Sequence, residues 1–180
     1  MSELPDVLGS KHCISILRRF LFRPGDEKYQ SEVVKDSGLS YVTTTRCLNM
    51  LVGQGLLKDS WFGGLRMYAL NAGSPVVRQM KVLLNVDALY DAVKDFAGQG
   101  FELYVYGSTA RGEDTEASDI DLLVLGTIDQ ETLSKMVRRV ESATRREARP
   151  LVRSRVEYAE MSRTDSAFYE NVTCDRIRII

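Results

Sequence analysis

Two pairs of polar residues stand close together in the second half of the chain. Gly107 and Ser108 form the first pair, and Asp119 and Asp121 form the second, ten residues further along. Apolar runs precede the first pair and follow the second, which predicts two short buried strands. Because alternate side chains of a strand share a face, the two aspartates are expected to point to the same side.

Residues of these types can bind a metal ion and a phosphate. Two carboxylates held close together repel each other unless a cation lies between them. Mg²⁺ is the expected cation, because it prefers hard oxygen ligands and substrate phosphates. A glycine lets the backbone approach a phosphate closely, and a helix that begins after it aims free N–H groups at the anion. The pattern therefore predicts a site for a magnesium ion and a phosphorylated ligand.

The wider pattern resembles the signature of a known family. It reads Tyr-Gly-Ser-Thr-Ala-Arg-Gly-Glu and, after a short gap, Ser-Asp-Ile-Asp-Leu-Leu-Val. This pattern resembles that of the minimal nucleotidyltransferases of the DNA polymerase beta superfamily, over residues 76–180. The resemblance implies that metal ions activate an attack on the α-phosphate of a nucleoside triphosphate, with pyrophosphate as the leaving group. The roles that it implies are triphosphate binding for Gly107, Ser108 and Arg111, and Mg²⁺ binding and catalysis for Asp119 and Asp121.

Members of this family usually have a third carboxylate, on the strand that follows the next helix. Here that strand is expected at residues 149–156, and it contains no acid. Glu147 lies just before it and Glu157 just after it, and either would complete the site if the strand boundaries shift by two residues. Glu157 also suits the start of the following helix, where the helix dipole favours an acid. Without a third carboxylate, turnover would be slow or absent.

The first seventy residues have a different pattern. Helices are predicted at residues 10–22, 29–36 and 41–53, and strands at residues 56–60 and 65–70 around a Phe62-Gly63-Gly64 turn. This order resembles the winged helix-turn-helix of bacterial and archaeal regulators, whose third helix enters the major groove of DNA. The residues that would face DNA are Thr43, Arg46 and Asn49 on the third helix, and Lys58 and Arg66 in the wing. The alternative is a protein-interaction or dimerisation module, because the charge excess of residues 1–75 is only +2.

The remaining segments complete a two-domain α/β (α+β) architecture. Residues 71–75 have the composition of a linker between a domain at 1–75 and a domain at 76–180. Residues 76–98 are expected to form two connecting helices, and residues 130–146 an amphipathic helix with a basic C-terminal part. The second domain is therefore predicted to contain a small mixed sheet flanked by helices.

Composition bears on location and on cysteine chemistry. The chain has 180 residues, of which 44% are hydrophobic and 27% charged, and its net charge is −1. No apolar run is long enough to span a bilayer and the N-terminus lacks a secretory signal, so a cytoplasmic protein is expected. The three cysteines are far apart and odd in number, which predicts packing roles for Cys13 and Cys47 rather than a disulfide or metal site.

Together these features predict a Mg²⁺-dependent enzyme that transfers a nucleoside monophosphate from a triphosphate such as ATP to an acceptor hydroxyl. The acceptor can belong to a partner protein, because the family resembled here includes antitoxins that modify a neighbouring toxin. A DNA-binding domain would suit transcription regulation, and a homodimer is expected because tight DNA binding needs two half-sites. The alternatives are a regulator whose degenerate nucleotidyltransferase domain only senses a nucleotide or mediates assembly, and a pure interaction protein.

Overall fold

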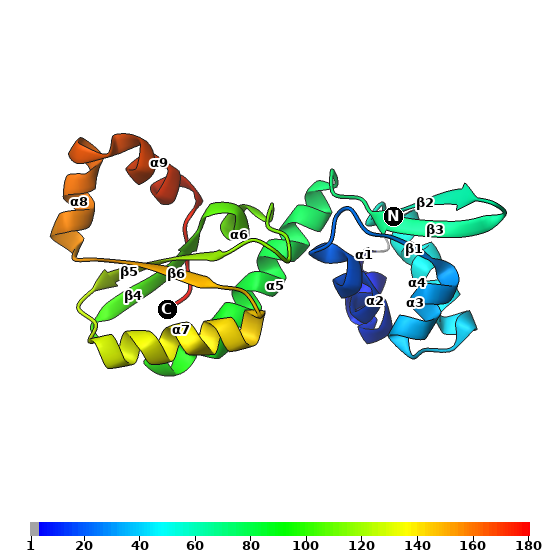
Figure 1. The fold of residues 1–180 in the computed structure, drawn as a ribbon, viewed down its shortest axis with the longest axis horizontal. Coiled ribbons are helices and arrows are strands. Elements are labelled where there is room, and N and C mark those ends of the chain that lie inside the picture. The colour runs from blue at the N-terminus through cyan, green and yellow to red at the C-terminus, as the bar shows by residue number, and fades with distance from the viewer. Residues whose placement is uncertain (1–3) are drawn as a thin grey trace. The chain divides into compact units, whose positions relative to one another are not determined.

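The computed structural model describes residues 4–180, which divide into two compact units (Figure 1). The first unit ends at Arg78 and the second begins at Gln79, so the division lies within helix α5 (Pro75–Val93). Each unit has a sheet of its own. Within residues 4–180, every helix is too short or too polar to span a lipid bilayer.

The first unit combines helices with an antiparallel three-stranded sheet. Its helices are α1 (Leu4–Gly9), α2 (Lys11–Leu21), α3 (Gln30–Ser37) and α4 (Tyr41–Gly53), and its strands are β1 (Glu27–Tyr29), β2 (Leu57–Phe62) and β3 (Leu65–Leu70), in the order β1-β3-β2. The three predicted helices and both predicted strands are confirmed. Sequence periodicity did not predict α1 and β1, which are too short to give a periodic signal. Phe62 belongs to β2 rather than to the turn, which consists of Gly63 and Gly64 at positive φ.

Helix α4 shows how local sequence specifies an element. The hydroxyl of Ser40 accepts a hydrogen bond from the backbone N–H of Thr43 at 3.1 Å, which caps the helix. The buried side of the helix carries Thr44, Cys47, Leu48 and Leu51. Arg46 and Asn49 lie on its exposed side. The helical period therefore separates the core side of α4 from its surface side.

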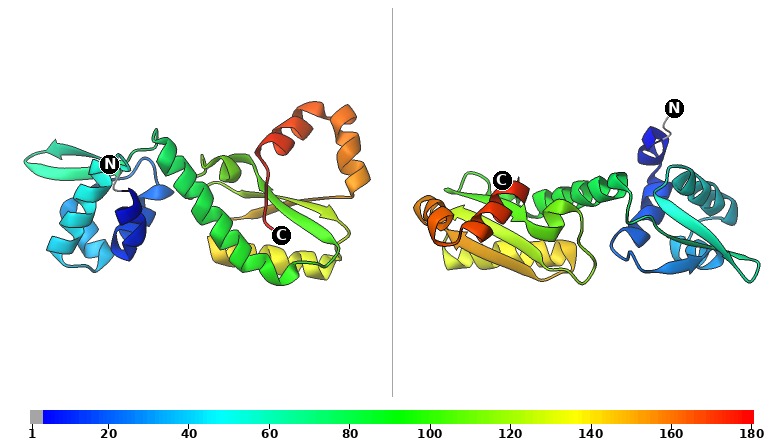
Figure 2. Two further views of the ribbon diagram at one scale, coloured as in Figure 1. Left: turned by 180° about the vertical axis from the view of Figure 1, so that it is seen from behind. Right: turned by 90° about the horizontal axis from the view of Figure 1, so that it is seen from above.

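The second unit is built on a four-stranded sheet with helices on both faces (Figure 2). After α5 its elements are the 3-10 helix η1 (Lys94–Phe96), β4 (Phe101–Tyr106), α6 (Gly107–Arg111), β5 (Ile120–Gly126), α7 (Gln130–Thr144), β6 (Ala148–Arg153), α8 (Arg155–Thr164), α9 (Ser166–Asp175) and β7 (Ile177–Arg178). The strand order is β6-β5-β4-β7, with β5 and β6 parallel and the other two pairs antiparallel. The predicted small mixed sheet flanked by helices is confirmed.

The central strand β5 is buried on both sides. Leu122 and Val124 belong to an apolar cluster that includes residues of α5 and α7. Leu123 and Leu125 belong to a second cluster that includes residues of α8 and α9. Because side chains alternate along a strand, Asp121 shares a face with Leu123 and lies on the side of α8 and α9. The site of the paired acids is therefore at the end of that face.

Residues 75–93 form one continuous helix where two helices were predicted. No glycine or proline follows Pro75 within this stretch, so no residue breaks the helix. The side chain of Asn85 is buried and donates a hydrogen bond to Asp114 at 2.9 Å, so it does not compete for the helix backbone. The 3-10 helix η1 follows α5 and ends at Phe96, which is buried.

Candidate active site

The Gly-Ser turn and the second aspartate lie against each other. Strand β4 ends at Tyr106 and α6 begins at Gly107. In the antiparallel pairing of β4 with β5, Tyr106 is opposite Asp121. Gly107 has a φ of +70°, and a Cβ atom at this position would lie 2.6 Å from Asp121 Oδ2. Glycine fits this position both because of its left-handed backbone and because it has no side chain.

The two aspartates flank a residue of the core. Ile120 is fully buried, whereas Asp119 and Asp121 on either side of it are partly exposed. Asp119 lies one residue before β5 rather than within the strand. The hydroxyl of Thr109 in α6 donates a hydrogen bond to the backbone carbonyl of Asp119 at 3.5 Å. The short helix after the turn therefore contacts the chain that carries the acids.

The carboxyl group of Asp121 is poorly solvated. Burial raises its pKa above the ordinary range of an aspartate, and the charge of Asp119 raises this pKa further. Nearby arginines, with Arg149 first among them, act in the opposite direction. Tyr106 has a raised pKa as well, first through burial and then through the charge of Asp121. A bound cation would relieve this accumulation of negative charge.

An arginine occupies the strand position nearest to the paired acids. In the parallel pairing of β5 with β6, Arg149 is the partner of Asp121. Its Nη1 is 2.8 Å from Asp119 Oδ2, and its Nε is 3.4 Å from Glu147 Oε1. The Arg149 and Asp119 side chains are 60% and 30% exposed, so their ion pair contributes little stability and separates easily.

The two glutamates that bracket β6 have different surroundings. Glu157 forms a capping box with Ser154, in which each backbone N–H donates to the other residue's side chain, at 2.7 and 3.2 Å. A strand rises by about 3.3 Å per residue, which puts Ser154 about 16 Å along the chain from Arg149. Glu157 therefore caps α8, far from the paired acids. Glu147 lies beside the site, with an exposed side chain.

The other predicted phosphate-binding residues lie in α6. The backbone carbonyl of Ser108 accepts a hydrogen bond from the N–H of Glu113 at 2.9 Å, which closes the turn after the helix. Arg111 donates to the carboxylate of Glu113 at 2.8 Å and to that of Asp175 in α9 at 2.6 Å. A triphosphate would have to compete with these two carboxylates for the guanidinium of Arg111.

A buried polar network, which the sequence analysis did not identify, holds the loop between α6 and β5. Asp114 is fully buried, and its carboxylate accepts hydrogen bonds from Asn85 at 2.9 Å and Arg146 at 2.7 Å. Lys81 donates to the backbone carbonyl of Asp114 and lies 3.5 Å from its Oδ1. Such partners are what a buried carboxylate requires. The sequence did contain a signal, because Lys81, Asn85 and Leu89 are spaced at four-residue intervals and share one side of α5.

Arg146 links this network to the paired acids. Its guanidinium donates to the backbone carbonyls of Ser118 at 2.6 Å and Asp119 at 3.2 Å, and to the hydroxyl of Thr109 at 3.1 Å. The side chain is only 7% exposed. It lies just beyond α7, whose C-cap residue Arg145 has a left-handed backbone. Arg146 therefore fixes the backbone that presents Asp119.

The residues predicted to face DNA lie in the first unit. Arg46 and Lys58 are exposed, on α4 and β2. Thr43 is partly buried, and its hydroxyl shares a hydrogen bond with that of Ser40 at 2.9 Å. Arg46 and Lys58 are therefore the more accessible cations of the predicted set.

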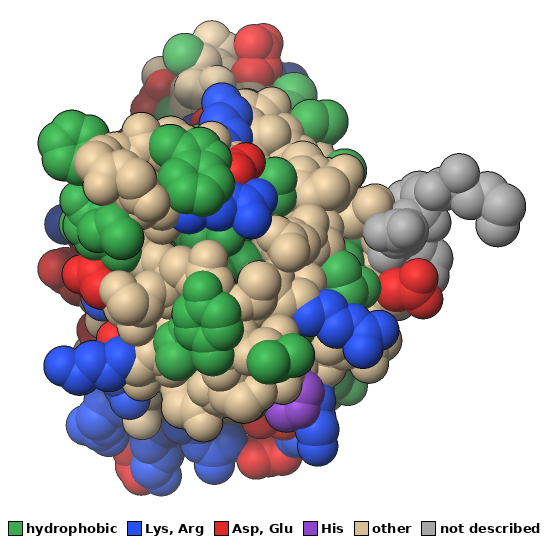
Figure 3. Space-filling model, turned by 90° about the vertical axis from the view of Figure 1, so that its right-hand side faces the viewer, with side chains coloured by type: hydrophobic (Ala, Val, Ile, Leu, Met, Phe, Trp, Pro, Cys, Tyr) green, Lys and Arg blue, Asp and Glu red, His purple; other side chains and the backbone are tan. Residues whose placement is uncertain are grey.

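Arg66 and Asn49, also predicted to face DNA, are engaged with each other. Arg66 donates to Asn49 Oδ1 at 2.7 Å and to Asp59 Oδ2 at 2.8 Å. Several large apolar side chains of this unit are exposed, namely Tyr41 and Val42 on α4, Trp61 and Phe62 on β2 and Leu65 on β3. Figure 3 shows hydrophobic side chains spread among polar and basic ones on the face in view. The exposed surface of this unit thus mixes large apolar groups with basic side chains.

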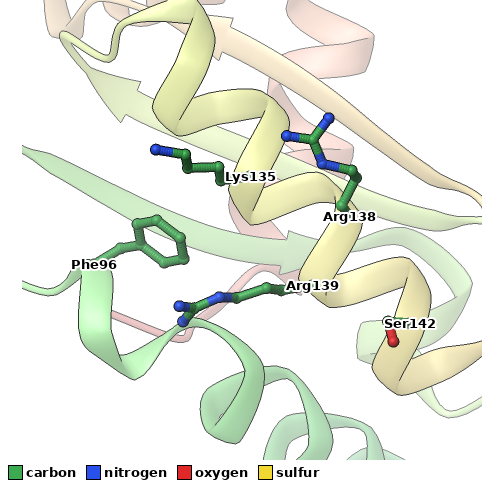
Figure 4. Close-up of a pocket in the computed structure, with 5 residues that line it drawn as sticks. All are labelled: Phe96, Lys135, Arg138, Arg139 and Ser142. Carbon is green, nitrogen blue, oxygen red and sulfur yellow. The ribbon is translucent and has the colours of Figure 1, made fainter.

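A separate basic groove occurs along α7 (Figure 4). Phe96, Lys135, Arg138, Arg139 and Ser142 line a hollow of about 350 Å³. The guanidinium of Arg139 lies 5.0 Å from the centre of the Phe96 ring and 2.8 Å from a carboxylate oxygen of Asp95. Phe96 belongs to the cluster on the α5 and α7 face of the sheet. The groove is therefore distinct from the site of the paired acids, which is on the opposite face.

Comparison with known proteins bears on the second unit. Residues 86–167 match the family model described as nucleotidyltransferase domain. The match begins within α5 and ends within α9, so it includes the Gly107-Ser108 turn and both aspartates. A search of curated proteins found no match to this chain. The matched segment is therefore similar to a nucleotidyltransferase domain, which supports the prediction that the protein is a transferase.

Proposed function

We propose that the second unit binds a nucleoside triphosphate with Mg²⁺ and transfers the nucleoside monophosphate to an acceptor hydroxyl. The observation that carries this proposal is the close approach of the turn to the acid, since a Cβ atom at Gly107 would lie 2.6 Å from Asp121 Oδ2. A phosphate bound at this turn would lie beside the carboxylates that hold its counterion. The nucleotidyltransferase match over residues 86–167 supports the same class of reaction.

The side chains present fit a magnesium ion. Mg²⁺ is usually held by one or two carboxylates together with substrate phosphates and water, and Asp119 and Asp121 supply that number. Within residues 4–180, no group of three or more His, Cys, Asp or Glu side chains is arranged to hold a metal ion by itself. When bound, the ion would polarise the phosphate oxygens and stabilise charge on the leaving pyrophosphate.

The protein residues have separate tasks in this proposal. Gly107 lets the backbone approach the phosphates, and the Ser108 hydroxyl adds a hydrogen bond to them. Arg111 adds positive charge near the triphosphate. Arg146 holds the backbone of Asp119 through the 3.2 Å hydrogen bond to its carbonyl. The proposed catalysis rests on positioning and on charge neutralisation.

Ser108→Ala is expected to weaken Mg²⁺–ATP binding by about 1 kcal/mol, or about fivefold, because one hydroxyl contact to a phosphate is lost. Isothermal titration calorimetry measures the affinity. Ser142→Ala removes a hydroxyl from the exposed surface of α7 and serves as the matched control. An affinity equal to that of wild type would remove Ser108 from the phosphate site.

For the first unit, we propose a winged helix-turn-helix that binds DNA upstream of the protein's own gene. The succession of α2, α3 and α4 followed by the β2–β3 hairpin supports this proposal, as do exposed Arg46 on α4 and Lys58 on β2. Two copies would read the two half-sites of an operator. The proposed acceptor is the product of a neighbouring gene, which the protein would modify as an antitoxin modifies its toxin.

Arg46→Ala is expected to weaken operator binding by about 1–3 kcal/mol, because a contact to a base edge is lost, and to relax specificity at one position. Lys58→Ala is expected to weaken binding to all sequences alike, because a phosphate contact carries no sequence information. The slope of log affinity against log salt concentration should also become shallower by about one, because one phosphate contact is lost. Fluorescence anisotropy with operator and scrambled duplexes at several salt concentrations separates the two effects. If Arg46→Ala weakens binding to the operator and to the scrambled duplex equally, Arg46 does not contact a base.

The surface of the first unit also favours a second candidate function. Trp61, Phe62 and Leu65 at the end of the hairpin are 70%, 68% and 60% exposed, and Arg66 is engaged with Asp59 and Asn49. Exposed apolar groups of this size suit contact with another protein. If gel shifts at low salt show no DNA binding by the full-length protein, with or without nucleotide, the first unit is an interaction module.

The decisive experiment for the second unit tests transfer directly. The protein is incubated with Mg²⁺, labelled ATP, GTP, CTP or UTP, and the product of its neighbouring gene. Label on the neighbour supports the transferase. Nucleotide binding without transfer to any acceptor supports instead a regulator that only senses the nucleotide. The observation that favours this alternative is Arg149, which stands beside Asp121 where an acid would complete a three-carboxylate site.

Arg149→Gln is expected to strengthen binding of Mn²⁺, used as a probe for Mg²⁺, by about two- to fivefold, because an exposed ion pair of about 0.5–1 kcal/mol competes with the metal for Asp119. Water proton relaxation measures the affinity in the absence of nucleotide. Arg145→Gln removes the same charge from an exposed residue nearby and is the control. An affinity that falls in Arg149→Gln would mean that the guanidinium does not compete with the cation.

A further inference from the structure

Two cysteines meet in the core of the first unit. Cys13 on α2 and Cys47 on α4 are 34 positions apart in the chain, and they are 1% and 4% exposed. Their Sγ atoms are 2.6 Å apart. Non-bonded heavy atoms in a packed core usually lie about 3.5–4.0 Å apart, so the two sulfur atoms are much closer than packing alone requires.

We propose that Cys13 and Cys47 form an oxidisable pair that closes into an intramolecular disulfide bond. A disulfide bond is about 2.05 Å long, so the sulfur atoms must approach by only about half an ångström more. Both residues lie within helices whose packing already brings the two side chains together. Closing the bond therefore requires the two sulfur atoms to move only a short distance.

A peroxide is the oxidant that this pair suits, because a small molecule can reach a buried thiol during brief local opening. One thiolate attacks a peroxide oxygen, which gives a sulfenic acid and releases hydroxide, and the second thiol then condenses with the sulfenic acid. The S–S bond forms as the S–O bond breaks, and water leaves. In total, two thiols lose two electrons and two protons, while hydrogen peroxide is reduced to two molecules of water.

The surroundings of the two thiols slow their oxidation. Burial and the neighbouring Cys13 raise the pKa of Cys47 to about 12, so the reactive thiolate is scarce at neutral pH. Cys174 on α9 is an exposed cysteine, so an oxidant reaches it directly. Once formed, the bond would link α2 to α4, the helix that carries Arg46, and it would stabilise the first unit by limiting its unfolded conformations.

Peptide mapping of the wild-type full-length chain tests the proposal. The reduced protein is treated with hydrogen peroxide, quenched, denatured, alkylated and digested. The expected result is a linked pair of peptides that contain Cys13 and Cys47, lighter by two hydrogen atoms than their sum, with both sites losing alkylation to the same extent. Cys174 is the internal control for exposure to the oxidant. The proposal is overturned if Cys174 is oxidised while Cys13 and Cys47 are alkylated or are oxidised separately.

Three variants provide a second readout. Oxidised wild type should show a higher thermal midpoint than the reduced protein, and Cys174→Ala should retain that shift. Cys13→Ala and Cys47→Ala should lose it, because one sulfur atom is absent. A shift that persists in either of these two variants would assign the stabilisation to another group. If these two variants do not fold, the peptide map of the wild type decides alone.

Discussion

Asp121→Asn is expected to weaken binding of Mg²⁺–ATP by more than about 100-fold, because loss of even an outer-shell partner of a metal typically costs 10–100-fold. Burial and the charge of Asp119 both raise the pKa of this carboxyl group, which means that they destabilise its charged form. A bound cation would offset that destabilisation, so its affinity should depend strongly on this carboxylate. An amide has a similar shape and no charge, which leaves the fold intact. Isothermal titration calorimetry measures the affinity, and thermal unfolding by circular dichroism checks the fold.

Two further variants make this test specific. Asp119→Asn is also expected to weaken binding, but less, because Arg149 already neutralises part of the Asp119 charge at 2.8 Å. Asp87→Asn removes a carboxylate from the exposed side of α5 and should leave the affinity unchanged. If both site variants bind Mg²⁺–ATP as wild type does, neither aspartate is a metal ligand.

Gly107→Val is expected to weaken nucleotide binding by more than about 100-fold, a loss comparable to removal of a metal ligand. A Cβ atom at this position would lie 2.6 Å from Asp121 Oδ2, so the carboxylate must move. The branched side chain would also fill the space that a phosphate needs, and a φ of +70° strains such a residue. Calorimetric titration with Mg²⁺–ATP measures the loss.

The strain of the turn can be separated from the clash with Asp121. Gly98 has a φ of +80°, and a Cβ atom added there would have nothing within 4 Å. Gly98→Ala and Gly107→Ala should therefore each lose about 1–2 kcal/mol of folding stability from the left-handed backbone. Only Gly107→Ala should also lose nucleotide binding. A folded Gly107→Ala protein with normal affinity would show that the close approach is not required for the ligand.

The elements that position the paired acids were predictable because their signals are local. Alternating and apolar runs mark β4 and β5, and the glycine between Tyr106 and Ser108 marks the turn. The cap of α4 depends on Ser40 and Thr43, which are three residues apart. The division of residues 76–98 into two helices was wrong, because no glycine or proline ends α5 before Val93.

The surroundings of the acids depended on strand register. The sequence placed Glu147 and Glu157 on either side of β6 but gave no alignment of β6 with β5. The parallel pairing puts Arg149 beside Asp121, and the capping box retains Glu157 at the start of α8. Register is decided by how complete strands and helices pack, so a motif within one segment cannot specify it.

By itself the sequence determined that a Gly-Ser turn and two acids follow each other between two successive strands, because all of these residues lie within fifteen positions, Gly107 to Asp121. Only the tertiary structure decided which residues far apart in the chain meet. Lys81 and Arg146 meet at Asp114, and Cys13 meets Cys47, across separations of 32 to 34 positions. Hydrophobic periodicity reports which side of an element is buried, but the partner on that side follows from the packing of whole elements.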